Sequence, residues 1–352
     1  MRDETLPRFV ELGAGIVNDL AALFAKFQTM PRVALLLCDE NTAGVGGHHI
    51  TETLRKDAVE VFECRVDNSD SDNVQRVRRE IECTVPDLVI GFGGGKVLDV
   101  AKLSAADSNT RFISVPTTLS NDGIASPVSV IKDVHNIPIS HITRPPFGVI
   151  IDITIVRTAP RRHLIAGVGD LISNLSAVFD ARLARAESAE SKEAIDSYAL
   201  QLAEAGGKRV LKLDDNDITS SRFLEELAHG LIKSGFAMCI SGTSRPASGS
   251  EHKISHSIDH LYPPNKGLHG EQVGIATLFT MALQKNELLK PVRKFYESIG
   301  FPCRIGYLNL KPDEFVQVVF NASRIRPERY TILEDKRPDE RKIREIIEFS
   351  GL

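Results

Sequence analysis

Short apolar runs alternate with helical stretches through about the first 155 residues of this 352-residue chain. Helical patterns fill the intervals, for example over residues 72–84 and 96–106. Alternation of strand and helix is typical of a parallel sheet with helices on its faces, so the sequence predicts a Rossmann-like α/β domain over residues 1–157. The five strand-like runs are residues 32–39, 58–66, 86–95, 111–118 and 147–156.

The character of the chain changes after Thr158. Residues 167–301 are rich in Ala, Leu, Glu and Ser at helical spacing, and the clearest helical block spans residues 174–206. A chain of this length is also too long for one compact core. We therefore predict a second, all-helical domain over residues 158–352, which ends in a charged surface helix within residues 335–352.

Charge and cysteine usage exclude several classes of protein. The formal net charge of −4 gives no electrostatic case for nucleic acid. No run of consecutive apolar residues approaches the roughly 18 residues of a membrane helix, and the first residues lack the layout of a signal peptide. The five cysteines are scattered and odd in number, which argues against a disulfide framework and for a reducing compartment. We expect a cytoplasmic protein.

A glycine-rich stretch, GFGGGKVLDVAK (91–102), follows one predicted strand and opens a predicted helix. Gly93, Gly94 and Gly95 would let backbone N–H groups approach a pyrophosphate, whose charge is attracted to a helix N-terminus. The stretch is neither G-x-G-x-x-G nor a P-loop, and a tight strand-to-helix turn is the structural alternative. Because of the flanking strand and helix, we predict that residues 1–157 bind a dinucleotide.

Polar residues follow two other predicted strands. Asp39 ends the first strand, where a carboxylate can bind an adenosine ribose; a helix cap is the equal alternative. The loop SVPTTLSNDGIASP (114–127) is dense in hydroxyl and amide groups. Such loops often only turn the chain, but its position after a strand favours a site. Its candidate ligand-binding residues are Thr117, Thr118, Ser120, Asp122 and Ser126.

Three histidines stand four residues apart in SGSEHKISHSIDHL (248–261). Ser248 and Glu251 have the spacing of a capping box, which predicts a helix from about Gly249. Lys253 occupies the position where a zincin protease has glutamate, so that class is disfavoured. The three histidines are His252, His256 and His260.

Two further residues complete a candidate metal site. His269 opens the next predicted helix, and Asp170 is expected at the start of another. One aspartate, two histidines and a water make a zinc site with an open position. Each residue alone is more commonly structural, and only the set of Asp170, His252 and His269 favours a metal.

Five motifs together resemble the superfamily of iron-containing alcohol dehydrogenases, glycerol dehydrogenases and dehydroquinate synthases. The likeness is greatest to the sn-glycerol-1-phosphate dehydrogenase branch, and it spans residues 88–280 most clearly. The PTTxGTGSE loop usual in the iron group and the HTxGH motif of dehydroquinate synthases are both absent. The motifs are GGGKVLDVAK, PTTLSNDGIASP, GVGDLISN, SGSEHKISH and LHGEQVG, in this order along the chain.

The resemblance implies roles for individual residues. Zinc ligands would be Asp170, His252 and His269, while Asp122 and His256 would act on the substrate, which Asp170 would also contact. His260 would be a bystander. The nicotinamide cofactor would be bound by Gly95, Lys96, Val97, Leu98, Asp99, Thr117, Thr118, Leu119, Ser120 and Ser126, beside the glycines and Asp39 named above.

The resemblance also implies a reaction. Zinc would polarise the C2 oxygen of dihydroxyacetone phosphate while NAD(P)H reduces it to sn-glycerol 1-phosphate for archaeal-type phospholipid synthesis. His256, or a water held by Asp122, would carry the proton, and Lys253 and Arg245 are nearby candidates for the phosphate. The alternatives are a glycerol dehydrogenase, a dehydroquinate-synthase-like lyase and a non-catalytic nucleotide-binding protein. We expect a small-molecule substrate and a homo-oligomer.

Overall fold

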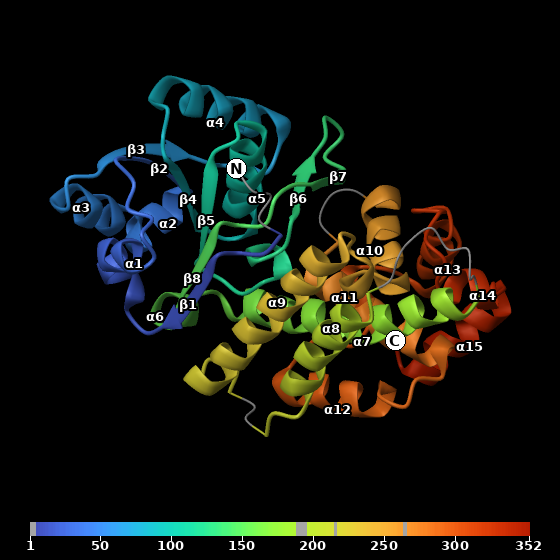
Figure 1. Cartoon of the computed structure of the whole chain (residues 1–352). Helices are drawn as coiled ribbons and strands as arrows, with labels where there is room; N and C mark the ends of the chain where they lie inside the picture. The colour runs from blue at the N-terminus through green and yellow to red at the C-terminus, as the bar shows by residue number, and fades with distance from the viewer. Residues whose placement is uncertain (1–4, 188–195, 215–216, 263–265) are drawn as a thin grey trace. The chain divides into compact units, whose positions relative to one another are not determined.

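The computed structural model describes residues 5–187, 196–214, 217–262 and 266–352 (Figure 1). Contacts divide the chain into two compact units. The first unit contains the described residues up to Leu119 together with Gly123–Pro160. The second unit contains Ser120–Asp122 and Arg161–Leu352, so a three-residue segment of the N-terminal half packs with the helical half.

A six-stranded sheet forms the centre of the first unit, and all of its strands run parallel. Its inner strands are almost entirely buried, as expected where helices cover both faces of a parallel sheet. The predicted α/β class is therefore confirmed. In spatial order the strands are β1 (Phe9–Gly13), β8 (Gly148–Asp152), β5 (Arg111–Pro116), β4 (Leu88–Gly93), β2 (Val33–Cys38) and β3 (Glu60–Arg65).

Helices connect these strands, and the two that the sequence predicted, over 72–84 and 96–106, are present as α4 and α5. A separate antiparallel pair, β6 (Val128–Lys132) and β7 (Pro138–Ile142), was not predicted. The helical elements up to residue 157 are η1 (Ile16–Asp19), α1 (Leu20–Lys26), α2 (Glu40–Thr42), the π-helical η2 (Ala43–Gly47), α3 (His48–Lys56), α4 (Ser71–Thr84), α5 (Gly95–Asp107), η3 (Asp122–Ile124) and α6 (Ile153–Arg157).

The predicted strand over residues 147–156 is too long. β8 ends at Asp152, and α6 begins at Ile153 because the Asp152 carboxylate caps it through the Thr154 amide. The same carboxylate accepts hydrogen bonds from the backbone amides of Gly15 and Val17, and so fixes the turn after β1. A run of apolar β-branched residues concealed this change from strand to helix.

The described part of the second unit is helical and contains no strand, as predicted. Its longest helix, α7, meets the length and composition of a membrane span, but 94% of the apolar window is buried inside the protein. The elements are α7 (Arg161–Glu187), α8 (Ser197–Leu211), α9 (Ser221–Ser241), η4 (Arg245–Ala247), α10 (Ser250–Leu261), α11 (His269–Gln284), α12 (Leu289–Ile299), η5 (Ile305–Leu308), α13 (Pro312–Ala322), α14 (Ile332–Lys336) and α15 (Glu340–Ser350).

Two smaller expectations are also met. The predicted charged tail helix is α15, which buries Ile343, Ile346 and Ile347 and exposes its charged face. All five cysteines are free thiols, in agreement with the absence of a disulfide framework.

Candidate metal centre and dinucleotide loop

The glycine loop joins β4 to α5 in the first unit. Gly93 ends the strand and Gly94 is the N-cap of α5, where it offers no capping side chain. A Cβ atom on Gly93 would lie 2.7 Å from the Val97 side chain, so only glycine fits there. The amide groups that open α5 are therefore suited to an anion.

The hydroxyl-rich loop lies beside the glycine loop. Gly93 and Pro116 are partners in the pairing of β4 with β5, and the Thr117 amide donates to the Gly93 carbonyl at 3.0 Å. The hydroxyls of Thr118 and Ser126 are buried without a hydrogen-bond partner. An unpaired buried hydroxyl costs about 1–3 kcal/mol, and a bound ligand or water is the usual compensation.

Other predicted cofactor residues have different surroundings. Val97, Leu98 and Leu119 are buried in the core, so a cofactor could meet only their backbone atoms. The exposed Lys96 donates to the Asp67 carbonyl at 3.0 Å. Asp99 and Ser120 are half-buried.

Asp39 caps the helix that follows β2. Its Oδ1 accepts from the Thr42 amide at 2.8 Å, while the Thr42 hydroxyl accepts from the Asp39 amide at 2.9 Å. This geometry agrees with the helix-cap alternative for Asp39. The ribose contact stays a prediction.

Asp170, His252 and His269 meet in the second unit. The Asp170 Oδ1 lies 3.9 Å from His252 Nε2 and 3.7 Å from His269 Nε2. One donor atom from each residue lies within 4.8 Å of the other two. His252 and His269 stand near the starts of α10 and α11, but Asp170 lies in the middle of α7. The expectation that Asp170 opens a helix is therefore wrong.

Two glycines bring the helices of these ligands together. A Cβ atom on Gly169 would overlap the Gly270 carbonyl oxygen, and one on Gly270 would overlap the Ala166 carbonyl oxygen. α7 and α11 thus touch backbone to backbone beside Asp170 and His269. The glycines of GVGD and HGEQVG are the sequence signal for this crossing.

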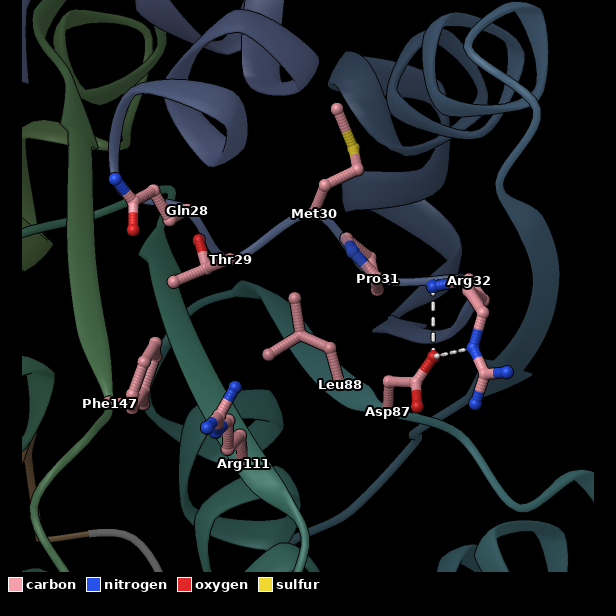
Figure 2. A pocket seen from close by; sticks show the side chains of 9 residues that line it. All are labelled: Gln28, Thr29, Met30, Pro31, Arg32, Asp87, Leu88, Arg111 and Phe147. Carbon is pink, nitrogen blue, oxygen red and sulfur yellow. Dashed lines mark hydrogen bonds and ion pairs between the residues drawn. The ribbon is translucent and has the colours of Figure 1, made fainter.

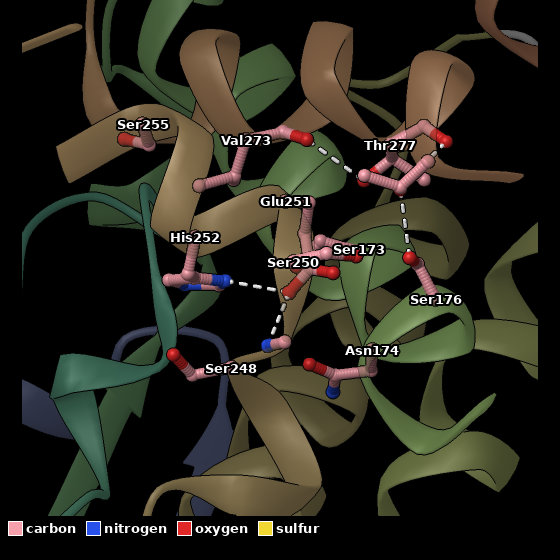
Figure 3. Close-up of polar contacts among 12 residues, drawn as sticks. Ser173, Asn174, Ser176, Ser248, Ser250, Glu251, His252, Ser255, Val273 and Thr277 are labelled. Atoms are coloured by element: carbon pink, nitrogen blue, oxygen red, sulfur yellow. Dashed lines mark hydrogen bonds and ion pairs between the residues drawn. The ribbon is translucent and has the colours of Figure 1, made fainter. Parts of the chain in front are cut away.

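The second nitrogen of each histidine ring is also bonded. His252 Nδ1 is 2.9 Å from the Glu251 Oε1, a contact drawn in Figure 3. His269 Nδ1 is 3.3 Å from the Ser255 hydroxyl. These partners fix the ring orientations and turn both Nε2 atoms toward Asp170, as around protein-bound metals.

The protonation states suit a metal. Burial, with smaller contributions from the charges of Arg326 and Arg329, lowers the pKa of His252 to about 3. The pKa of His269, whose side chain is 38% exposed, shifts in the same direction through burial, His252 and Arg326. Burial and the neighbouring Asp122 raise the pKa of Asp170 well above its usual value. A divalent cation would favour the ionised carboxylate, and neutral imidazoles are the form that binds metals.

Asp122 and His256 lie beside this cluster. The Asp122 amide donates to Asp170 Oδ2 at 2.9 Å, and the Ser234 hydroxyl donates to Asp122 Oδ2 at 2.7 Å. Asn174 in turn donates to the Ser234 hydroxyl. The His256 ring centre is 6.3 Å from that of His269, and burial, then the charge of Arg326, lowers its pKa well below the usual value. His260 is exposed.

The predicted capping box at the start of α10 is wrong. The N-cap is Gly249, whose amide donates to the Glu251 carboxylate at 2.6 Å. Ser248 is extended instead, because its carbonyl accepts from Arg329 at 2.8 Å and its hydroxyl accepts from Arg326 at 3.4 Å. Glu251 is therefore a partner of His252 as well as of the helix start.

The two predicted phosphate candidates are engaged inside the helical unit. Lys253 is 1% exposed, and its ammonium donates to the Arg329 carbonyl and to Glu334. Arg245 is 3% exposed and donates to the Tyr330 carbonyl. Neither side chain is a surface group.

A cavity of about 310 Å³ lies elsewhere in the first unit (Figure 2). Asp87 precedes β4, and Arg111 and Leu88 open β5 and β4, so the cavity is at the amino ends of the strands. Cofactors of parallel sheets bind at the carboxyl ends, where the glycine loop lies. The cavity is therefore not the dinucleotide site.

Solved structures of known proteins share this fold. A probable glycerol dehydrogenase from Sinorhizobium meliloti superposes with a TM-score of 0.79 at 23% identity, covering 98% of both chains. Glycerol dehydrogenase from Schizosaccharomyces pombe gives 0.77 at 22% identity, covering 99% of this chain and 90% of that one. A family model described as iron-containing alcohol dehydrogenase matches residues 11–160. The fold of this chain is therefore that of the solved glycerol dehydrogenase structures.

Proteins related in sequence identify the family of this chain. Glycerol-1-phosphate dehydrogenase (NAD(P)+) from Thermococcus sibiricus is 38% identical over 329 residues, covering 93% of this chain and 92% of the relative. The protein of the same name from Archaeoglobus fulgidus is 34% identical over 352 residues, covering 99% and 98%. The chain therefore belongs to the glycerol-1-phosphate dehydrogenase family, which confirms the resemblance seen in its motifs.

Proposed function

We propose that this chain reduces dihydroxyacetone phosphate to sn-glycerol 1-phosphate with NADH or NADPH, for archaeal-type phospholipid synthesis. Relatives of that name match more than nine-tenths of the chain. The observation that carries the proposal is the cluster of Asp170, His252 and His269. It offers one carboxylate oxygen and two neutral imidazoles, which fit a zinc ion with an open coordination position.

When bound, zinc would polarise the C2 oxygen and the nicotinamide would supply the hydride. The chain would hold zinc through Asp170, His252 and His269. Glu251 and Ser255 keep the two imidazoles in place through their Nδ1 atoms. The Asp122 amide orients Asp170 by donating to its Oδ2.

His256 is the proposed source of the proton that the C2 oxygen gains. A neutral imidazole carries one ring proton and one acceptor nitrogen, so it can donate the proton from one nitrogen while the other nitrogen accepts a proton from water. The low pKa of His256 keeps it neutral near pH 7. The Asp122 carboxylate, fixed by the Ser234 hydroxyl, could hold a water on the same proton path.

The glycine loop is the proposed site of the cofactor pyrophosphate. Support comes from the uncapped start of α5 at Gly94 and from the unpaired hydroxyls of Thr118 and Ser126 close by in the chain. A nucleotide at the start of α5 would meet backbone amides and a favourable helix dipole.

An assay of NADH and NADPH consumption tests the function. We expect the zinc-loaded chain to reduce dihydroxyacetone phosphate far faster than dihydroxyacetone, because remote binding energy holds the reacting geometry. The product should be inert to a dehydrogenase specific for sn-glycerol 3-phosphate. Equal efficiency on glycerol and glycerol phosphate would indicate a glycerol dehydrogenase instead. Phosphate release without net NADH change would indicate the lyase.

A further inference from the structure

Two helices of the second unit, α7 and α11, each carry a candidate metal ligand at the place where they cross. Asp170 lies in α7 and His269 opens α11, and their nearest ligand atoms are 3.7 Å apart. Zinc bonds to oxygen and nitrogen are about 2.0–2.2 Å long, so each ligand must be held within about 0.5 Å of its bonding position. The contacts that set the position of α7 against α11 therefore also set the metal site.

The Glu271 carboxylate, in the first turn of α11, is the most highly bonded group at this crossing. Its side chain is 0% exposed. Arg162 of α7 donates to both carboxylate oxygens, from Nε at 2.7 Å and from Nη2 at 2.8 Å. The Tyr307 hydroxyl donates to Oε1 at 2.9 Å, and the Leu268 amide donates to Oε2 at 2.7 Å. Each oxygen thus has two donors, which fix the carboxylate in one orientation.

Arg162 stands on the face of α7 that meets α11. Arg162, Ala166 and Asp170 are spaced four apart, so their side chains follow one side of the helix. Successive turns of this side meet the first residues of α11: Arg162 bonds to Glu271, the Ala166 carbonyl lies against Gly270, and Asp170 approaches His269. The ion pair and the two ligands therefore belong to one continuous line of contact between the helices.

We propose that Arg162 and Glu271 are positioning residues for the metal, an inference that rests on the proposed function. Their ion pair would hold α7 and α11 in the register that brings Asp170 and His269 to one ion. The close backbone contact at Gly270 limits how near the helices come, but it does not stop one from sliding along the other. A guanidinium bonded to a carboxylate at two points fixes both position and angle.

Zinc affinity tests the proposal. In Arg162→Met the Glu271 carboxylate stays buried without its cation, an arrangement that costs enough to shift the helices. We expect the zinc dissociation constant to rise by about 10- to 100-fold, the usual effect of losing a residue that supports a metal ligand. Competition with a chromophoric chelator measures it.

Arg162→Lys is the conservative variant. The ammonium keeps the charge and loses the two-point fork, so its zinc dissociation constant should lie between those of the unmodified chain and Arg162→Met. This variant also serves if Arg162→Met fails to fold.

Arg209→Met is the matched control, because Arg209 makes the same kind of pair between two other helices of this unit. It donates to both oxygens of Glu226, at 2.9 and 2.6 Å, and so joins α8 to α9. Neither helix carries a proposed ligand. Zinc affinity should stay within about twofold of that of the unmodified chain, as for distant and independent sites, even where the melting temperature falls.

A double variant gives a second measurement. Glu271→Gln replaces one carboxylate oxygen by an amide group that cannot accept from the guanidinium, so it should also weaken zinc binding. Arg162→Met and Glu271→Gln remove the same pair, and their effects on zinc affinity should therefore not add when they are combined.

Three results would overturn the assignment: equal zinc affinity in Arg162→Met and the unmodified chain, an equal loss in Arg162→Met and Arg209→Met, or additive effects in the double variant. The second would indicate general destabilisation. If the unmodified chain binds zinc and does not reduce dihydroxyacetone phosphate, the proposed function fails, while the zinc affinities still decide the role of the ion pair. An unmodified chain that binds no zinc would overturn both.

Discussion

The orientation of each metal-facing histidine depends on a residue that sequence spacing did not reveal. Asp170, His252 and His269 could be predicted because their types and motifs suit a metal. Glu251 was interpreted as a capping residue because of its spacing from Ser248. A contact with the adjacent His252 was not expected, since neighbours on a helix do not ordinarily face each other. The structure shows that Glu251 also contacts His252 Nδ1.

Glu251→Gln should weaken zinc binding by about 10- to 100-fold, the usual effect of removing a partner of a metal-bound histidine. The amide keeps an acceptor oxygen but loses the charge that strengthens the bond to His252 Nδ1. Competition with a chromophoric chelator measures the affinity.

His260→Ala is the control for this experiment, because His260 is exposed on the same helix and should not affect zinc affinity. Equal zinc affinity in Glu251→Gln and the unmodified chain would show that Glu251 does not position His252.

At the scale of elements, strand and helix periodicity predicted the inner strands and the edge strand β3, and missed the other edge strand, β1. The inner strands are continuous apolar runs, such as Leu35, Leu36 and Leu37. β1 is an edge strand that is mostly half-exposed, and its sequence FVELG has no continuous apolar run. The β6–β7 pair is similarly mixed in burial. Strands of this kind form because of packing against neighbouring strands more than because of their own composition.

The crossing of α7 and α11 should not tolerate a side chain. In Gly270→Ala the added methyl group would meet the Ala166 backbone, so the helices must separate. Overpacking of this kind costs about 1–3 kcal/mol, and the separation would move His269 away from Asp170. We expect a lower denaturation midpoint and a loss of zinc.

Gly306→Ala is the matched control, because a Cβ atom there meets nothing within 4 Å. It should leave stability and zinc content close to those of the unmodified chain. Full zinc content with an unchanged midpoint in Gly270→Ala would contradict the close crossing.

At the scale of the whole molecule, the two proposed sites use different units. The metal ligands belong to the second unit, and the glycine loop belongs to the first. The change of composition after Thr158 predicted two parts of this kind. It could not predict that Ser120–Asp122 belongs with the helical part, because that depends on bonds from Asp122 to Asp170 and Ser234.

Removing zinc should therefore loosen one unit selectively. A ligand stabilises the structure that binds it, so chelation should speed amide hydrogen exchange in α7, α10 and α11. Exchange in β4 and α5 should change little on chelation and should slow when NADPH is added. An equal response of β4 and α10 to the chelator would contradict the assignment of the metal to the helical unit.

The excursion of Ser120–Asp122 means that the polypeptide passes from one unit to the other three times, after Leu119, after Asp122 and after Pro160. A gene cut at the last of these points would yield a helical fragment beginning at Arg161. That fragment would contain Asp170, His252 and His269 but not the Asp122 amide that bonds to Asp170. The contacts thus define two units, but one cut in the chain does not separate them. Recombination between relatives should therefore exchange residues 120–122 together with the helical half.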